Sequence, residues 1–434
     1  MRRGAGGRER SPRPPPRRRA RVLLPPRSQR HPATAASDDA RAQLAINVRR
    51  WRALDAERRA RDAEEIRTEA ERPILTVEDT FCDIDDGSAE SHEARKVALH
   101  VSQSIISLSS FAGRKRIRVC SGFVIRWNDS ASTGTILTSA ALVRSPCGDD
   151  VRVEVLLTSG DKSHGQIGTI DFRYNVGLVE VTSNHKLQEA VVLKDVVDRG
   201  DVLALGRAYE GGLLMCSRGK INNRANIFEC SELLVSNCKI TMAGTGGPLV
   251  NYNGHVVGLN FFEANQTPFI SMAIVLRCLE HHQRFGRIIR PWFGFRFTSI
   301  QMVPLSYLEH TYKILSDVDN GLYISNVAKG SPAHVTGLCK GDILIKCGGK
   351  VLSTAPEFGA MLLDICKEHM EAYVQETDGG ISGERITVEI VIKRQKDGST
   401  VEKTISAGLL ETFNYNRWDT PFPSYRVKRG TGWC

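Results

Sequence analysis

The sequence predicts a mainly β protein whose folded part follows a basic tail and a helix. From about residue 93 to 287, short apolar runs rich in Val, Ile and Leu alternate with Gly, Asn and Asp. This texture is typical of antiparallel strands joined by tight turns. Residues 288–410 continue the texture and add two helix-like segments. We therefore expect an all-β domain over 93–287, followed by a smaller β-rich domain with two helices.

The parts outside these two domains differ from them in composition. Residues 1–38 are rich in Arg and Pro and cannot build a packed core, so we expect disorder. Residues 39–72 turn to Ala, Arg, Glu and Leu with apolar positions at helical spacing, which predicts a mostly exposed helix. Residues 73–92 are expected to be a linker, and residues 411–434 form a C-terminal tail with no clear pattern.

Within the two domains, several segments predict individual elements. Asn251 to Gly254 is a hairpin turn signal, since Asn and Gly tolerate the backbone angles of tight turns. In the second domain we expect a strand at 321–327, a short helix at 331–338 that ends near Gly337, a hairpin at 341–351 that turns at Gly348-Gly349, and a longer helix at 356–370. A further short helix is expected at 272–286, at the end of the first domain.

The positive charge lies in the tail. The 434-residue chain has a net charge of +10, but its first 50 residues hold 14 arginines and only three acidic residues. The rest carries 45 basic and 46 acidic residues, so the folded part gives no general argument for nucleic-acid binding. The RRRAR run at 17–21 is compatible with a nuclear import signal, a nucleic-acid tether, a plastid or mitochondrial transit peptide, or a solvated tail without an address.

Cysteine usage indicates an intracellular, reducing compartment. The eleven cysteines are odd in number, form no CxxC pair and follow no apolar secretory segment, so free thiols are expected. His281-His282 has no partner at a metal-ligand spacing, and neither a metal nor another cofactor is expected. No run approaches the roughly 18–20 apolar residues of a membrane span.

Seven segments in order resemble the HtrA/Do-like serine protease family, in which a trypsin-like double β-barrel precedes a PDZ domain. The resemblance covers residues 93–408. It implies the double barrel over 93–287 and the PDZ domain over 288–410. The segments are CSGFVI, LTSAALV, NVGLVEV, DRGDVLALGRA, GTGGPLVNYNGHVVGLN, RPWFGFRF and GLYISNVAKGSPAHVTGLCKGDILIKCGGKVL.

The three catalytic positions that the resemblance implies are all replaced. Ala141 stands at the histidine position, Asn175 at the aspartate position and Thr245 at the serine position. The family mechanism needs a hydroxyl, an imidazole that takes its proton and a carboxylate that orients the imidazole. Without a base, the hydroxyl of Thr245 is a poor nucleophile, so none of the three is expected to be active. His164 and His255 are the nearest candidates by sequence for a replacement base.

The loop Ala243-Gly244-Thr245 keeps the frame of an oxyanion hole. In the family, the backbone N–H groups at the positions of Ala243 and Thr245 would point at a substrate oxyanion. Alternatively, the glycines that follow are there because the barrel turn requires them.

The resemblance also implies a peptide site in the PDZ domain. Trp292, Phe293, Gly294 and Phe295 match the loop that receives a peptide C-terminus while the peptide adds a strand to the sheet edge. The helix 356–370 would form the other wall. Arg290 or Arg296 would attract the carboxylate, and the insertion 298–320 would cap the groove. The alternative is that Trp292 and Phe295 are ordinary core residues.

These features lead to one main hypothesis and two alternatives. The main hypothesis is a catalytically inactive HtrA/Do-like homologue, a scaffold whose PDZ domain binds protein C-termini or unfolded peptides. The first alternative is an active or weakly active endopeptidase in protein quality control. The second is a nuclear adaptor that combines the PDZ domain with the basic tail. Because the family often forms trimers, a homo-oligomer is also expected.

Overall fold

The computed structural model describes residues 79–144, 151–222, 230–263, 265–309, 318–376 and 385–411. The chain divides into two compact units, Met1–Thr68 and Glu69–Cys434, and every described residue belongs to the second. The expected disordered tail 1–38, the expected helix 39–72, the start of the expected linker and residues 412–434 lie outside the description.

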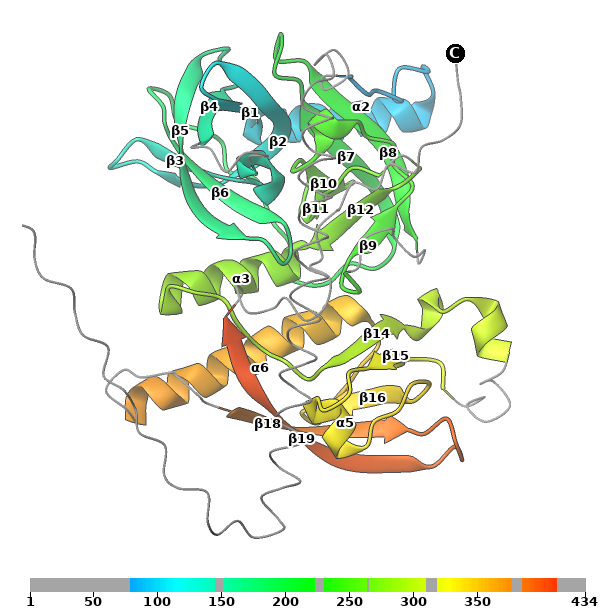
Figure 1. Cartoon of the computed structure of the whole chain (residues 1–434). Coiled ribbons are helices and arrows are strands. Elements are labelled where there is room, and N and C mark those ends of the chain that lie inside the picture. The colour runs from blue at the N-terminus through cyan, green and yellow to red at the C-terminus, as the bar shows by residue number, and fades with distance from the viewer. Residues whose placement is uncertain are drawn as a thin grey trace, which may run out of the picture. The chain divides into compact units, whose positions relative to one another are not determined.

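The first domain opens with a closed barrel of six antiparallel strands (Figure 1). Its interior is filled by aliphatic side chains that alternate along the strands with outward-facing polar ones, as the period of two in a strand requires. The strands pair in the order β1-β2-β3-β6-β5-β4. They are β1 (Ile105–Ala112), β2 (Lys115–Asn128), β3 (Thr133–Ser139), β4 (Val151–Leu156), β5 (Lys162–Asp171) and β6 (Val176–Thr182).

A second closed barrel follows, with the order β10-β11-β12-β9-β8-β7, and the predicted double barrel is confirmed. The predicted hairpin turn joins β10 and β11, where Gly254 has a φ of 77° and donates its N–H to the Asn251 carbonyl at 2.9 Å. The strands are β7 (Gly200–Arg207), β8 (Leu214–Asn222), β9 (Leu234–Ser236), β10 (Pro248–Asn251), β11 (Val256–Asn260) and β12 (Thr267–Ser271).

The expected linker 73–92 is folded over its described part. Phe81 and Ile84 are buried, and the helix α2 (Ala89–Val101) begins inside it, capped by the Ser88 hydroxyl. The sequence predicted a linker because this stretch is polar and acidic. Hydrogen bonds and ion pairs, rather than an apolar run, anchor it to the barrel. We call residues 79–88 the N-terminal strap.

The third part is the sheet of the predicted PDZ domain, ordered β13-β19-β18-β16-β15-β14 with β17 beside β16. The predicted short helix is α5 (Pro332–Thr336), ended by Gly337 at a φ of 81°, and the predicted longer helix is α6 (Ala355–Glu376). The strands are β13 (Ile289–Pro291), β14 (Phe295–Ser299), β15 (Leu322–Val327), β16 (Ile343–Cys347), β17 (Lys350–Val351), β18 (Arg385–Lys393) and β19 (Thr400–Glu411).

The predicted helix at the end of the double barrel is α3 (Met272–Phe285), which packs against α6. Arg277 donates to Asp364 at 2.8 Å, and the Nε2 atom of His281 lies 2.9 Å from the Leu363 carbonyl oxygen. Burial lowers the pKa of His281, which favours its neutral form in this contact.

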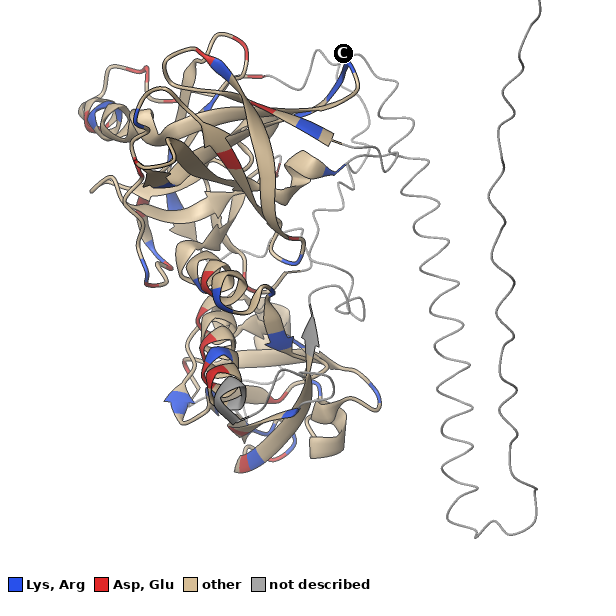
Figure 2. Cartoon of the chain, turned by 90° about the vertical axis from the view of Figure 1, so that its left-hand side faces the viewer, with Lys and Arg blue, Asp and Glu red and all other residues tan. Residues whose placement is uncertain are grey.

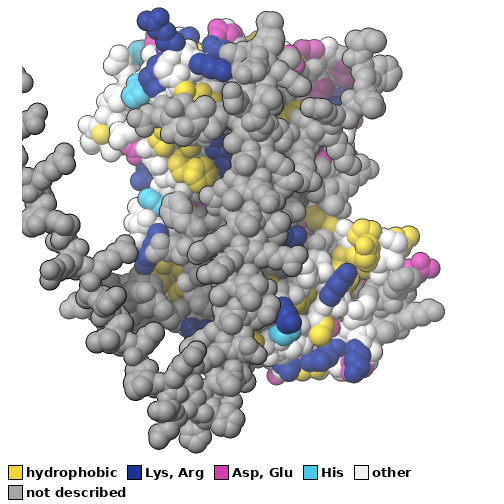
Figure 3. Space-filling view, in the orientation of Figure 1, with side chains coloured by type: hydrophobic (Ala, Val, Ile, Leu, Met, Phe, Trp, Pro, Cys, Tyr) yellow, Lys and Arg dark blue, Asp and Glu magenta, His cyan; other side chains and the backbone are white. Residues whose placement is uncertain are grey.

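The described surface is mixed in character. Basic and acidic residues are interspersed over both domains (Figure 2), and the apolar side chains visible in Figure 3 form small separate patches. The nine described cysteines are all free. No described helix combines the length and apolarity that crossing a bilayer requires, and the described residues contain no cluster of His, Cys, Asp or Glu suited to a metal ion.

Candidate functional site

Ala141 lies where β3 ends and the 3-10 turn Ala140–Val143 begins. The hydroxyl of Ser139 caps this turn by accepting the Ala141 N–H at 3.1 Å. The side chain is a buried methyl group, 5% exposed. It can neither take nor give a proton, so Ala141 contributes no acid–base chemistry.

Asn175 precedes β6 in a left-handed backbone conformation, with a φ of 55°. Its carbonyl accepts the Ala140 N–H at 3.0 Å, which places it beside the Ala141 turn. The side chain is 2% exposed, and both of its polar atoms lack a hydrogen-bond partner among the described residues. An unpaired buried amide costs about 1–3 kcal/mol, so this position is destabilising as it stands.

Thr245 follows the 3-10 turn Met242–Gly244 of the second barrel. Its carbonyl accepts the Ser121 N–H at 2.9 Å, and its buried hydroxyl has no hydrogen-bond partner within the described part of the chain. The next residue, Gly246, has a φ of 83°, and a Cβ there would lie 2.7 Å from the Ser139 nitrogen. Glycine is therefore required by the close approach of this loop to β3, as the barrel-turn interpretation predicted.

These contacts bring Ala141, Asn175 and Thr245 together at the end of β3. Ser139 pairs with Val176, the neighbour of Asn175, and lies two residues before Ala141. The loop containing Thr245 reaches the same strand end from the other barrel. Ala141, Asn175 and Thr245 thus lie around one strand end, where they present a methyl group, an amide and a hydroxyl.

In the loop 240–245, backbone N–H groups donate to carbonyls of the loop itself, an arrangement that we call the inward turn. The Thr245 N–H donates to the Met242 carbonyl at 3.0 Å, and the Gly244 N–H donates to the Thr241 carbonyl at 3.0 Å. One of the two expected oxyanion donors is therefore already used inside the loop, which corrects the expectation for Thr245. The other expected position, Ala243, is fully buried, and its carbonyl accepts the Ser121 hydroxyl at 2.7 Å.

The two candidate replacement bases lie elsewhere. His164 is in β5, opposite Glu154 of β4. His255 is in the β10–β11 hairpin, where its backbone N–H donates to the side-chain oxygen of Asn251. Among the described residues, no hydrogen bond joins either imidazole to Thr245.

In the PDZ domain, Trp292, Phe293 and Gly294 form the loop between β13 and β14. Gly294 has a φ of 79°, and a Cβ there would lie 2.2 Å from the Cβ of Ser331. Because β14 ends the strand order of the sheet, its outer side is the place where an added strand would pair.

The aromatic residues of this region pack as a cluster. Phe293 stacks on Phe295 with ring centres 6.0 Å apart, and Phe297 meets Phe358 of α6 edge to face at 5.1 Å. Phe293 and Phe295 are 6% and 8% exposed, while Trp292 is half-buried. The ordinary-core interpretation therefore holds for the ring of Phe295, and α6 packs near β14.

Sequence reasoning missed a loop of the second barrel, Cys230–Leu233, that reaches this edge. The Ser231 hydroxyl donates to the Phe297 carbonyl at 2.5 Å. A Cβ at Gly359 of α6 would lie 2.9 Å from the Cγ of Glu232. No motif marks this loop, because the contact joins segments 66 residues apart.

Arg290 does not serve a peptide carboxylate. Its side chain is 5% exposed and pairs with Asp171 at 2.7 Å, and its Nη2 atom also lies 3.2 Å from the Cys278 sulfur. Burial alone would lower the pKa of Arg290, but the charge of Asp171 reverses this and the net shift is upward. Arg290 is thus a structural residue at the domain junction, and of the two expected arginines only Arg296, half-buried on β14, remains a candidate.

Comparison with known proteins agrees with this architecture. Residues 120–259 match the trypsin-like peptidase domain, and residues 290–363 match the PDZ domain. The chain is 27% identical over 277 residues to "Putative protease Do-like 14" of Arabidopsis thaliana, an alignment covering 59% of this chain and 62% of that protein. It is 26% identical over 272 residues to mitochondrial serine protease HTRA2 of Bos taurus, covering 58% and 57%.

The trypsin-like and PDZ matches, together with these relatives, support the HtrA family for this chain. Among solved structures, the serine endoprotease from Yersinia pestis aligns with 73% of this chain and 97% of its own, at 18% identity and a TM-score of 0.43. The chain spans about three fifths of the length of the two HtrA/Do-like relatives above. Their names describe proteases, and what this member does is a separate question.

Proposed function

We propose that this HtrA/Do-like homologue is catalytically inactive and acts as a peptide-binding scaffold through its PDZ domain. The observation that carries the proposal is Ala141, which leaves the Thr245 hydroxyl without a base. In a related triad, losing the serine or histidine alone costs about 10⁶-fold in turnover. No described interaction compensates for that loss here, since the Thr245 hydroxyl has no partner.

The inward turn of the loop supports the same conclusion by a second route. Removing one oxyanion donor costs about 10²–10³-fold in turnover in a serine protease. The Thr245 N–H is already bonded to the Met242 carbonyl, so a substrate oxyanion would have to displace that bond first.

The PDZ domain needs no catalytic residue to work. Gly294 keeps the loop that precedes an edge strand, and α6 stands beside that strand. The ligand class we propose is a protein C-terminus or an unfolded peptide with an apolar last residue, which would extend the sheet from β14. A homo-oligomer, as in much of the family, is part of the same proposal.

The second candidate function is weak endopeptidase activity in protein quality control, favoured by the protease names of the relatives. A casein degradation assay and labelling by a serine-directed fluorophosphonate separate the two. We expect neither degradation nor labelling above that of the Thr245→Ala variant. Labelling that disappears in Thr245→Ala would establish the active alternative.

Peptide binding is tested on the full chain with pairs of peptides that differ only at the C-terminus. A peptide ending in an apolar residue with a free carboxylate should bind at micromolar affinity, the range expected once ordering costs are met. Amidation should weaken binding about tenfold or more, because it removes the charged acceptor of the hydrogen bonds in the loop. Equal affinities would mean that this loop is not a carboxylate site.

A further inference from the structure

The N-terminal strap lies against the loop that carries Thr245. Phe81 is 8% exposed and packs with Ile240 and Ala243 in the core of the second barrel. A Cβ built on Gly244 would lie 2.7 Å from Cε1 of Phe81, closer than such contacts normally come. The ring of Phe81 therefore fills the space that a side chain at position 244 would need.

Hydrogen bonds continue this contact on both sides of the ring. The Thr241 hydroxyl, at the start of the loop, donates to the carbonyl of Asp79 in the strap. The Ser217 hydroxyl of β8 donates to Asp83 at 2.7 Å and accepts the Lys239 N–H at 2.8 Å. Ser217 thus connects the strap to the segment that leads into the loop.

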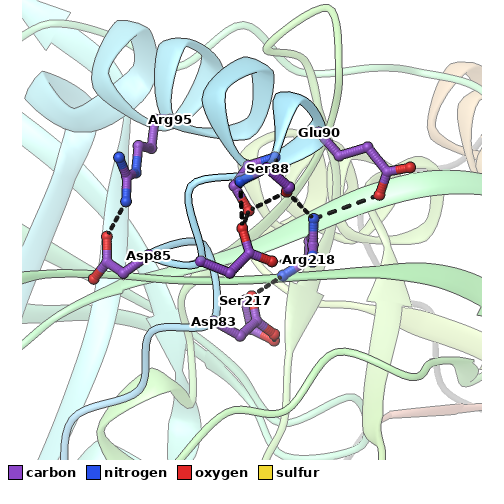
Figure 4. A network of polar contacts seen from close by, with 9 residues as sticks. Asp83, Asp85, Ser88, Glu90, Arg95, Ser217 and Arg218 are labelled. Carbon is purple, nitrogen blue, oxygen red and sulfur yellow. Dashed lines mark hydrogen bonds and ion pairs between the residues drawn. The ribbon is translucent and has the colours of Figure 1, made fainter.

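The strap is itself fixed to β8 (Figure 4). The backbones of Cys82 and Cys216 pair in an isolated parallel β-bridge, and both thiols are free. The Asp83 carboxylate accepts the backbone N–H of Arg218 at 2.8 Å. The Arg218 side chain pairs with Asp86 at 2.7 Å and reaches Ser88 at 3.3 Å. These bonds hold the strap at the position where Phe81 meets Gly244.

We propose that the N-terminal strap holds the 240–245 loop in its inward turn, through the contact of the Phe81 ring with Gly244. In that turn the N–H of Thr245 stays bonded to the carbonyl of Met242. This contact accounts for two features together, namely the glycine at position 244 and the inward turn of the loop. It depends on the conformation of the loop and is independent of the proposed function.

The first test is hydrogen exchange of the full chain, read on a peptide covering residues 240–246. Phe81→Ala should speed exchange in this peptide at least about tenfold relative to the wild type, because the loop loses its packing partner. Phe111→Ala removes the same group from β1, where Phe111 contacts Arg116 and Arg152, and should leave the peptide unchanged. Unchanged exchange in Phe81→Ala would overturn the proposal.

The second test stays informative even if Phe81→Ala lowers stability throughout the protein. Gly244→Ala should lower the melting temperature strongly in the wild type, where its methyl group meets Phe81. In the Phe81→Ala background the same change should cost less than half as much, since the two contacts with the Phe81 ring are then gone and only the one with the Cβ of Ile240, at 3.0 Å, remains. Such coupling is expected only for residues in contact. Additive shifts would show that Phe81 does not control this loop.

Discussion

The barrel site at the end of β3, where Ala141, Asn175 and Thr245 meet, and the PDZ edge at β14 differ in the chemistry that each region offers. In the barrel site, the turns bring together three residues that include no acid or base, and the buried polar atoms of the Asn175 side chain and the Thr245 hydroxyl have no hydrogen-bond partner among the described residues. At the PDZ edge, the loop has a glycine at positive φ and the aromatic rings pack as a cluster. Catalysis depends on particular functional groups, whereas strand addition depends on backbone geometry, and this difference is the basis of our proposal that the chain binds peptides without cleaving them.

The largest effect is expected at the loop glycine. Gly294→Ala should destabilise the PDZ domain by more than about 3 kcal/mol, because its methyl group would meet Ser331 at 2.2 Å in a backbone conformation that disfavours side chains. Gly349→Ala is the matched control, with a φ of 75° and open space, and should cost only about 1 kcal/mol. Urea unfolding measures both, and equal costs would mean that the loop can move away from Ser331. It also follows that bulky substitutions at Gly294 are poor probes of peptide binding.

The second largest loss of stability is expected for a substitution at Asn175, in the barrel site. Asn175→Asp should lower the free energy of unfolding by about 3 kcal/mol at pH 7, because it buries a carboxylate without an opposite charge. Burial raises a carboxyl pKa, so the loss should shrink as the pH falls toward about 4 and the group becomes neutral.

The matched control for this change is Asn175→Gly. It suits the φ of 55° and removes the unpaired amide, so it should cost less than about 1 kcal/mol. If Asn175→Asp were instead fully tolerated with its new carboxylate ionised, the surroundings of residue 175 would have to supply a cationic partner, and the contrast between the barrel site and the PDZ edge would be weakened.

The sequence predicted features that depend on local chemistry. The hairpin turn at Gly254 and the end of α5 at Gly337 followed from glycine's access to positive φ. The double barrel and the PDZ sheet followed from motifs in a fixed order.

Features that depend on distant partners could not be predicted in this way. Arg290 was expected to face a ligand, but its partner Asp171 is 119 residues away. The strap was read as a linker because its anchor, Arg218, lies more than 130 residues further along the chain. The inward turn of the Thr245 N–H is an orientation of the peptide plane, which residue types alone do not specify.

A smaller change in the free energy of unfolding is expected at Thr245, and Thr138, whose hydroxyl is hydrogen-bonded, is its control. Thr245→Val should raise the free energy of unfolding by about 1 kcal/mol, because it keeps the branched shape and removes a buried hydroxyl that has no partner among the described residues. Thr138→Val makes the same change at a hydroxyl that donates to the Ser121 carbonyl at 2.7 Å, and it should lower stability by about 1 kcal/mol. Two losses of equal size in thermal unfolding would mean that Thr245 has a hydrogen-bond partner in solution.

The smallest expected effect concerns the PDZ edge. The Ser231 hydroxyl donates to the Phe297 carbonyl of β14, on the strand that an added peptide would extend. A ligand that uses this carbonyl must displace Ser231, so Ser231→Ala should raise the affinity for a carboxylate-ended peptide about threefold, within the net value of one hydrogen bond. Ser163→Ala removes a similar serine–carbonyl bond, to Thr182 in the first barrel, and should leave affinity unchanged. Fluorescence anisotropy with a labelled peptide measures both, and unchanged or weaker binding in Ser231→Ala would place the peptide away from the Phe297 edge.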